Sequence, residues 1–407
     1  MKSQASGFRF FVSGMLCGIA ILFVNCGGAS THNNSTMQTP SSASNVQPVV
    51  VNSGPTNNYA NGIFTSITVC VPSISTCQTI DAVLVDTGSY GLRLLSSAGG
   101  GELSLSLPAQ RDTGGSPIGE CASFVSGYTW GPVTTADVTI AGEQANKVPV
   151  QVIDQTFASV PQPCKNGGLP ANLTLQTLGA NGILGIGPYV QDCGNACTLT
   201  GPENPGLYYL CSSASCQVTA EALSDQVQNP VALFSQDNNG VLLQLPAVST
   251  PQGSLNGSMI FGIGTQSNNH IGKAEVFPID SSGDFNTTFN GQTYPSFVDS
   301  GSNALFFLDS SVPGLTICSD NSGFYCPASP TSLSATTSSS KAKTTINFSV
   351  DNADDLFSNH ENFVFSTLAG PNSGMFDWGL PFFFGRNVFT AIESRSTPSG
   401  PGPYWAY

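Results

Sequence analysis

The sequence predicts an all-β protein built from two similar β-rich lobes. Short runs of Val, Ile, Phe and Thr recur between Gly, Asn, Ser and Pro, a pattern typical of strands joined by turns. The 407 residues include 44 Gly and 27 Pro, and 40% are hydrophobic, which is enough for a large core. Two segments of similar pattern, around Asp86 and Asp299, indicate an internal duplication and therefore two lobes.

The first segment, residues 1–26, has the features of an export signal. Lys2 and Arg9 precede an apolar run from Phe10 to Val24, which is too short to span a membrane comfortably. Cys26 follows this run directly and resembles the lipidated cysteine of bacterial lipoproteins. The alternative is ordinary cleavage after Ala29. We therefore expect an exported protein, anchored to a membrane only through a lipid on Cys26, or else secreted.

The rest of the chain divides into a tether and two lobes. Residues 27–58 contain no Lys, Arg, Asp or Glu and are rich in Ser, Thr, Asn and Pro, which predicts a flexible tether with order beginning near Tyr59. We assign the N-terminal lobe to residues 59–250 and the C-terminal lobe to residues 251–407, with a connector over Pro246–Ser258. The low-complexity stretch Ser329–Lys343 predicts an exposed loop.

Charge and cysteine content exclude some functions. The formal net charge is −14, with 11 basic residues against 25 acidic ones, so no basic patch for nucleic acid is expected. Setting aside Cys17 and Cys26 leaves an even number of the 12 cysteines, as disulfides in an exported protein require. A zinc site is the alternative, but His32, His270 and His360 lack ligand-like spacing, and we expect no metal. The cysteines that we expect to form disulfides are Cys70 with Cys77, Cys193 with Cys197, Cys211 with Cys216, Cys318 with Cys326, and the remaining Cys121 and Cys164.

The two repeated segments carry the chemistry. "DAVLVDTGSYGLRLL" contains Asp86 and "PSFVDSGSNALFFL" contains Asp299; in each, an apolar strand ends in Asp-Thr/Ser-Gly-Ser and a second apolar strand follows. An apolar run ending in Gly comes later in each half, at Gly185 and at Gly385. "RDTGGSP" around Asp112 also contains Asp-Thr-Gly, but polar residues flank it, so it predicts only a surface turn.

Two carboxyl groups brought within hydrogen-bonding reach resist ionising together, so one keeps a proton and the pair titrates as a unit. The charged member can take a proton from a water molecule, and the protonated member can donate to a substrate carbonyl. The residues expected to support such a pair are Thr87, Gly88 and Ser89 in the first loop and Ser300, Gly301 and Ser302 in the second.

From about Tyr59 to Glu393, the sequence resembles the pepsin-like, two-lobed aspartic peptidases, as a divergent bacterial exported member. "QTIDAVLVDTGS" and "FVDSGSNALFF" are similar to the two active-site loops of that family, and "NGILGIGP" and "FFFGRNVFTAIE" to its hydrophobic-hydrophobic-Gly elements. The resemblance implies a two-lobed fold with a central cleft. It also implies that Asp86 and Asp299 are the catalytic pair, supported by Ser89 and Ser302.

The resemblance further implies a flap, a hairpin that covers the cleft. "CASFVSGYTWG", from Cys121 to Gly131, is the candidate segment, and its candidate contact residues are Phe124, Tyr128 and Trp130. Arg93 departs from the family, because many members have an aromatic residue at this position near the flap.

Three functions are compatible with these patterns. The first is an exported aspartic endopeptidase, a monomer without cofactors, that hydrolyses extended polypeptides by a two-Asp mechanism. The second is a pepsin-fold surface lipoprotein that binds a peptide, glycan or protein without cutting. The third is an adhesin-like β-sandwich in which both motifs are accidental turns; the ordered series of matches argues against it.

Overall fold

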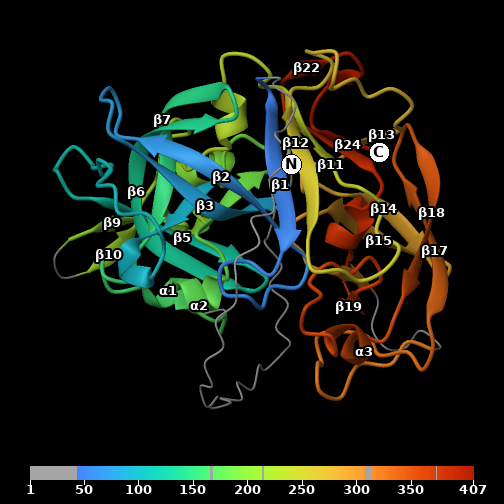
Figure 1. The fold of residues 1–407 in the computed structure, drawn as a ribbon. Coiled ribbons are helices and arrows are strands. Elements are labelled where there is room, and N and C mark those ends of the chain that lie inside the picture. Colours follow the sequence, from blue (N-terminus) through green and yellow to red (C-terminus); the bar gives the residue numbers. More distant parts are fainter. Residues whose placement is uncertain (1–43, 166–167, 213–214, 308–313, 373) are drawn as a thin grey trace, which may run out of the picture.

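The computed structural model describes residues 44–407, apart from 166–167, 213–214, 308–313 and 373. In this part of the chain, strands dominate and form two barrel-like sheets, which confirms the all-β, two-lobed prediction (Figure 1). The helical segments are short: α1 (Gln162–Lys165), α2 (Leu175–Leu178), α3 (Ala353–Phe357), and the 3-10 turns η1 (Ser97–Gly99), η2 (Gly194–Thr198), η3 (Gly201–Glu203), η4 (Pro230–Leu233) and η5 (Leu380–Phe383).

The first half of the chain forms one end of a 15-stranded sheet, in the order β10-β9-β5-β6-β7-β4-β8-β3-β2. The long strand β6 also pairs with β2, which closes this end on itself. Its strands are β2 (Gly62–Cys70), β3 (Cys77–Asp86), β4 (Tyr90–Leu95), β5 (Ile118–Phe124), β6 (Gly127–Ile140), β7 (Glu143–Ile153), β8 (Gly182–Ile186), β9 (Tyr208–Cys211) and β10 (Cys216–Val218).

Six strands at the other end of the same sheet join the two halves of the molecule, in the order β1-β12-β11-β21-β24-β13. They come from the start, the middle and the end of the described chain: β1 (Val46–Asn52), β11 (Gly240–Gln244), β12 (Leu255–Phe261), β13 (Val276–Pro278), β21 (Asn387–Ala391) and β24 (Tyr404–Ala406). The boundary predicted between residues 250 and 251 falls between β11 and β12, which pair with each other.

The second half forms a seven-stranded sheet in the order β18-β17-β14-β15-β20-β16-β19. Its strands are β14 (Phe285–Phe289), β15 (Gln292–Val298), β16 (Leu305–Phe307), β17 (Thr331–Ser338), β18 (Lys343–Val350), β19 (Ala369–Pro371) and β20 (Phe376–Trp378), and a separate small hairpin joins β22 (Ser396–Thr397) to β23 (Gly400–Pro401). Aromatic rings fill the core of the seven-stranded sheet. Phe376 stacks on Phe307, with ring centroids 5.0 Å apart, and on Trp378, with ring centroids 4.4 Å apart.

Two sequence predictions about flexible segments are wrong over the residues that the structure describes. The predicted tether over residues 27–58 includes β1, whose β-branched and apolar residues pair with β12 on one side and β2 on the other. The predicted loop over Ser329–Lys343 contains β17, which pairs with β18 and buries Ala335 on its inner face. In both segments, buried Val, Thr or Ala side chains alternate with more exposed ones, and this burial stabilises a strand despite the low-complexity composition. The export segment and Cys26 lie outside the described residues.

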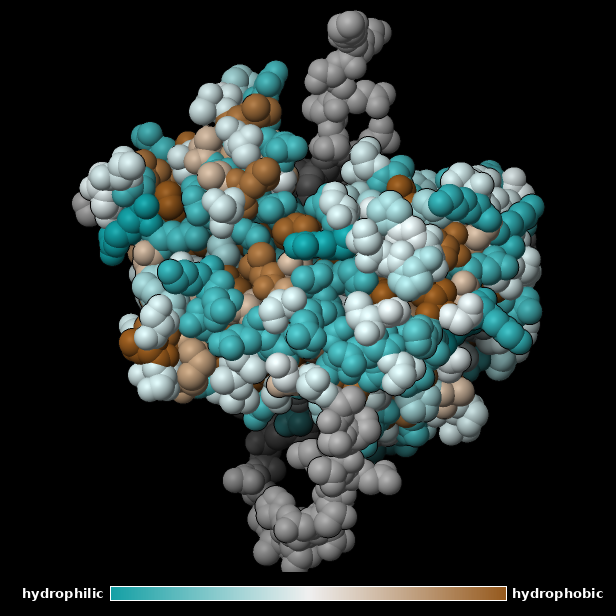
Figure 2. All heavy atoms as spheres, turned by 90° about the horizontal axis from the view of Figure 1, so that it is seen from above, coloured by the Kyte–Doolittle hydropathy of each residue, from teal (hydrophilic) through white to brown (hydrophobic). Residues whose placement is uncertain are grey.

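The surface is mostly hydrophilic, with hydrophobic side chains present singly or in small groups on the face shown in Figure 2. Among the described residues, Val125, at the tip of the hairpin between β5 and β6, is the most exposed large hydrophobic residue, at 97%. None of the helices in the described ranges is long and apolar enough to cross a membrane.

Candidate active site

Asp86 and Asp299 lie at the ends of two equivalent strands. Asp86 ends β3, and Asp299 directly follows β15. In each loop, the Gly two positions later donates its backbone N–H to the Asp Oδ1, at 2.8 Å for Gly88 and 2.7 Å for Gly301. In each loop, the Ser three positions later donates its hydroxyl to Oδ2 of the same Asp. The sequence repeat is therefore a repeat of geometry: each carboxyl is oriented by one amide and one hydroxyl.

The two loops also hold each other. The Thr87 hydroxyl donates to the carbonyl of Val298 at 2.9 Å and accepts the Ser300 backbone N–H at 2.9 Å. In the reciprocal contact, the Ser300 hydroxyl donates to the carbonyl of Val85 at 2.7 Å and accepts the Thr87 backbone N–H at 3.1 Å. Both hydroxyl residues are buried. This crossed pair of hydroxyls fixes the distance between the lobes at the point where the carboxyls meet.

The carboxyl groups of Asp86 and Asp299 lie within hydrogen-bonding reach of each other. The glycines make this approach possible. A Cβ on Gly88 would lie 2.6 Å from Cγ of Asp299, and a Cβ on Gly301 would lie 2.6 Å from Oδ1 of Asp86. Burial, followed by the charge of Asp299, raises the pKa of Asp86 well above its ordinary value. The pair can therefore hold one proton between its two carboxyls.

A further strand supports each loop from behind. In the first lobe, β8 runs parallel to β3 with Gly185 opposite Asp86. In the second lobe, the equivalent strand is β20, which runs parallel to β15 and is followed by Gly379. The prediction of Gly385 for this place is wrong, because "FFFG" lies in and just after the turn η5 and leads into β21 of the joining sheet.

The predicted flap segment is a hairpin made by β5 and β6, with Phe124 opposite Gly127 across its turn. Trp130 does not cover a cleft: it is fully buried, packs on Phe157 and Tyr209, and donates its indole N–H to the carbonyl of Ala158. Tyr128 is 6% exposed. Tyr128 therefore packs in the same buried cluster as Trp130. Phe124 is half-buried, with its ring against the guanidinium of Arg93, and its role as a contact residue stays a prediction, as does that of Tyr128.

Both edges of this hairpin are occupied, which sequence reasoning did not anticipate. On one edge, β5 pairs with β9, and the Cys121 backbone N–H donates to the carbonyl of Leu207. On the other edge, the backbone of Tyr128 exchanges hydrogen bonds with Pro170 and Asn172. A disulfide between Cys121 and Cys164 adds a covalent link to α1. The base of the hairpin is therefore an inner part of a sheet.

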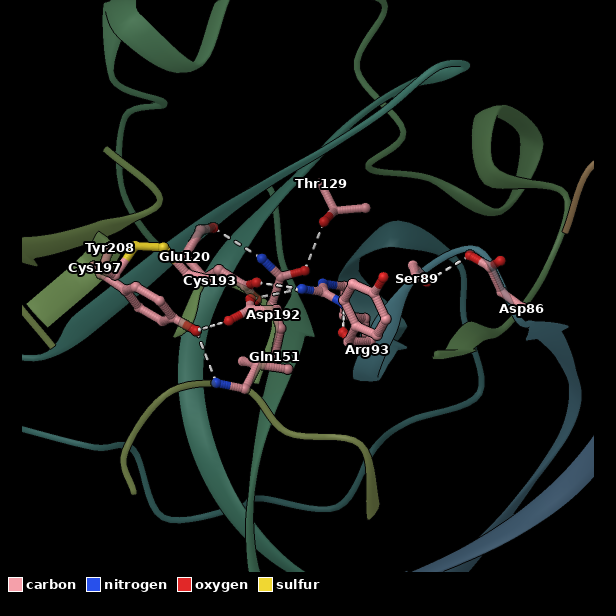
Figure 3. Close-up of polar contacts among 12 residues, drawn as sticks. Asp86, Ser89, Arg93, Glu120, Thr129, Gln151, Asp192, Cys193, Cys197 and Tyr208 are labelled. Atoms are coloured by element: carbon pink, nitrogen blue, oxygen red, sulfur yellow. Dashed lines mark hydrogen bonds and ion pairs between the residues drawn. A yellow bond between two sulfur atoms is a disulfide. The ribbon is translucent and has the colours of Figure 1, made fainter. Parts of the chain in front are cut away.

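Arg93 is the centre of a buried ionic cluster between the first loop and this hairpin (Figure 3). Its guanidinium contacts Glu120 of β5 at 2.5 Å and Asp192 at 2.9 Å, and it donates to the Tyr90 carbonyl at 2.7 Å. Tyr208 donates its hydroxyl to the other oxygen of Asp192 at 2.6 Å. Burial, followed by the charge of Glu120, raises the pKa of Asp192 well above its ordinary value.

Comparisons with known proteins agree with this fold. A model of the family described as "Protein of unknown function (DUF3443)" matches residues 41–407. The chain belongs to this family. Among solved structures, it is similar to the aspartic proteinase from Irpex lacteus, at a TM-score of 0.51 and 14% sequence identity, over 89% of this chain and 96% of that one. No curated protein matches the chain.

All five disulfides expected from the sequence are present in this DUF3443 chain: Cys70–Cys77, Cys121–Cys164, Cys193–Cys197, Cys211–Cys216 and Cys318–Cys326. Disulfides persist in oxidising compartments, so their number is consistent with an exported protein.

The structure brings together every residue that the sequence predicted for the two loops. It adds Glu120 and Asp192, which lie 27 and 99 positions from Arg93. The only signal for them was Arg93 itself, a charge within the apolar stretch "GLRLL", which requires a buried acid somewhere in the fold.

Proposed function

We propose that this protein is an exported aspartic endopeptidase, with Asp86 and Asp299 as its catalytic pair. The observation that carries the proposal is the contact between the buried carboxyl of Asp86 and the half-buried carboxyl of Asp299, each oriented by one backbone N–H and one hydroxyl. A binding protein has no need for two acids in this arrangement, since burying them is costly unless they share a proton.

The chemistry follows from the shared proton. With one proton on the pair, the ionised carboxyl takes a proton from a water molecule as its oxygen attacks the peptide carbonyl carbon. The protonated carboxyl donates to the carbonyl oxygen, which gives a neutral tetrahedral diol. Transfer of a proton to the amide nitrogen then allows the C–N bond to break, and the pair returns to its singly protonated state.

The substrate in this proposal is a polypeptide in an extended conformation, bound by the monomeric protein between its lobes. No cofactor takes part. We further propose that lipidation at Cys26 holds the enzyme at a membrane on the exported side, with simple secretion after Ala29 as the alternative.

The test is cleavage of an unfolded protein between about pH 3 and pH 6, the range for a carboxyl pair that shares one proton. We expect wild-type cleavage to be blocked by a pepstatin-type inhibitor and to be lost in Asp86→Asn and in Asp299→Asn. Asp237→Asn is the matched control, because Asp237 is also buried, at 4% exposure, but bonds to Thr265 and Gln266 away from the pair. Cleavage that persists unchanged in Asp86→Asn would refute the proposal.

One observation favours a second candidate, a pepsin-fold protein that binds a partner without cutting it. The flap hairpin is held at both edges, by β9 and Leu207 on one side and by Pro170 and Asn172 on the other, which restricts any opening of the cleft. Tight binding of an extended peptide by the wild-type protein, with no cleavage over the same pH range, would favour this candidate.

A further inference from the structure

A third carboxyl, that of Asp377 on β20, lies next to the pair. Asp377 is 5% exposed, and it lies opposite Phe297 in the parallel pairing of β20 with β15, the strand that leads to Asp299. Burial, followed by the charge of Asp299, raises the pKa of Asp377, and the charge of Asp86 adds to this effect. The charges of Asp299 and Asp86 therefore both oppose ionisation of Asp377.

This acid breaks the symmetry between the two lobes. In the first lobe, β8 runs parallel to β3 with Ile183 opposite Leu84, two positions before Gly185. Asp377 has the same place in the second lobe, two positions before Gly379. An apolar residue suits such a buried position, so a carboxyl there is costly unless it has a role.

Among the residues that the structure describes, no cation forms an ion pair with Asp377. In the described part of the chain, the ion pairs are those of Arg93, in the first lobe. The neighbouring strand β15 (QTYPSFV) has Tyr294 as its one titratable residue, and β16 (LFF) and η5 (LPFF) have none. The groups that act on Asp377 are thus Asp299, Asp86 and the hydroxyl of Ser302.

Ser302 connects Asp377 to the pair. Its hydroxyl has a single hydrogen, which it donates to Oδ2 of Asp299 at 2.8 Å. The same hydroxyl lies close enough to Asp377 to lower the pKa of that carboxyl, although burial outweighs this effect, and the Asp377 Oδ1 has no hydrogen-bond partner among the described residues. A protonated Asp377 can donate to Ser302, which forms a directed chain from Asp377 through Ser302 to Asp299.

We propose that Asp377 is a third carboxyl of the active site: a positioning residue that acts on Asp299 through Ser302 and shares the protons of the pair. This inference rests on the proposed function for its effect on cleavage. Once Asp377 ionises, its negative charge makes loss of the proton shared by Asp86 and Asp299 harder. Three carboxyls therefore keep that proton to a higher pH than two would, which extends the working range toward neutral pH.

Two substitutions separate charge from hydrogen bonding. Asp377→Asn removes the charge but keeps an N–H that can donate to Ser302, whereas Asp377→Ile removes both and reproduces the apolar residue of the first lobe. We expect both to move the alkaline limb of the pH profile of kcat/KM down by about one pH unit or more. Only Asp377→Ile should also lower the rate at the optimum. Asp237→Asn should superimpose on wild type.

A second measurement does not depend on activity. Side-chain carboxyl 13C resonances of the aspartates can be followed by NMR as a function of pH in the folded protein. In the wild type, the pH titration curves of the Asp86 and Asp299 carboxyl resonances should be broad and coupled to the ionisation of Asp377. In Asp377→Asn, they should move to lower pH and reduce to two coupled steps.

The two proposals can fail separately. If wild type cuts no substrate, the peptidase proposal fails, while the carboxyl titrations still decide the role of Asp377. If the Asp86 and Asp299 titrations are the same in wild type and in Asp377→Asn, the role proposed for Asp377 is refuted, whether or not the protein cuts peptides.

Discussion

Replacing Arg93 by Met tests whether the buried ionic cluster holds the first lobe together. The substitution keeps an unbranched side chain but removes the positive charge between Glu120 and Asp192. Arg93 is 2% exposed, and the side chains of both acids are no more than 4% exposed, so water cannot replace the guanidinium. Each close pair is worth about 4 kcal/mol at an effective dielectric constant of about 20, before desolvation is subtracted.

The net loss expected for Arg93→Met is about 3–5 kcal/mol of unfolding free energy at pH 7, the range for buried ion pairs that lose one partner. The loss should shrink at acid pH. In the wild type, the charge of Arg93 lowers the pKa of Asp192, so without this cation the folded-state pKa of Asp192 rises further. The penalty from this acid is therefore absent below its unfolded-state pKa and grows as the pH increases toward its folded-state pKa.

The assay is equilibrium urea unfolding at pH 4.5 and pH 7, with the disulfides intact. Arg386→Met is the matched control, because Arg386 is half-buried, and its recorded contacts are a hydrogen bond to the carbonyl of Phe382 and the ring of that residue. It should cost about 1 kcal/mol or less. A loss under about 1 kcal/mol for Arg93→Met, or an equal loss at both pH values, would refute the reasoning.

Three other predictions follow from the same structure. Burial, followed by the charge of Asp280, raises the pKa of Asp284 to about 7. The wild type should therefore lose stability as the pH rises from about 4 to about 7. The variant Asp284→Asn should lose less stability over this range, as measured by urea unfolding at pH 5 and pH 8. Replacing both Cys121 and Cys164 by Ala opens a link across 43 residues and should cost about 4 kcal/mol in the same assay; a cost near zero would contradict a role of this link in stability. Thr87→Val leaves two backbone groups unpaired between the lobes and should cost about 1–3 kcal/mol and lower cleavage, whereas retention of both wild-type values would show that the crossed hydroxyls are dispensable.

The parts of the structure that sequence reasoning predicted well are local. Four of the five disulfides join cysteines at most eight positions apart, and the fifth followed because two cysteines remained. The two active-site loops were recognisable because a strand, a tight turn and a second strand are contiguous in the chain.

The parts that failed depend on distant partners. The segments "FDWG" and "FFFG" lie close together in the sequence, and each consists mainly of apolar residues followed by a Gly. Only the pairing of β20 with β15 shows that Gly379, not Gly385, supports the second loop. Likewise, nothing near Val46–Asn52 in the sequence reveals its partner β12, and an uncharged segment was interpreted as a tether. The third acid was missed for the same reason, since Asp377 is remote in sequence from both loops.

The position of β1 has a consequence for the order of folding. Val46 lies opposite Ile260, so the first described strand finds one of its two neighbours more than 200 residues later in the chain. A chain that emerges with its N-terminus first can form the hairpin of β1 and β2 early, but the other edge of β1 stays unpaired until β12 has emerged. Completion of the joining sheet is therefore a late event, and until then this edge is open to incorrect pairing with other chains.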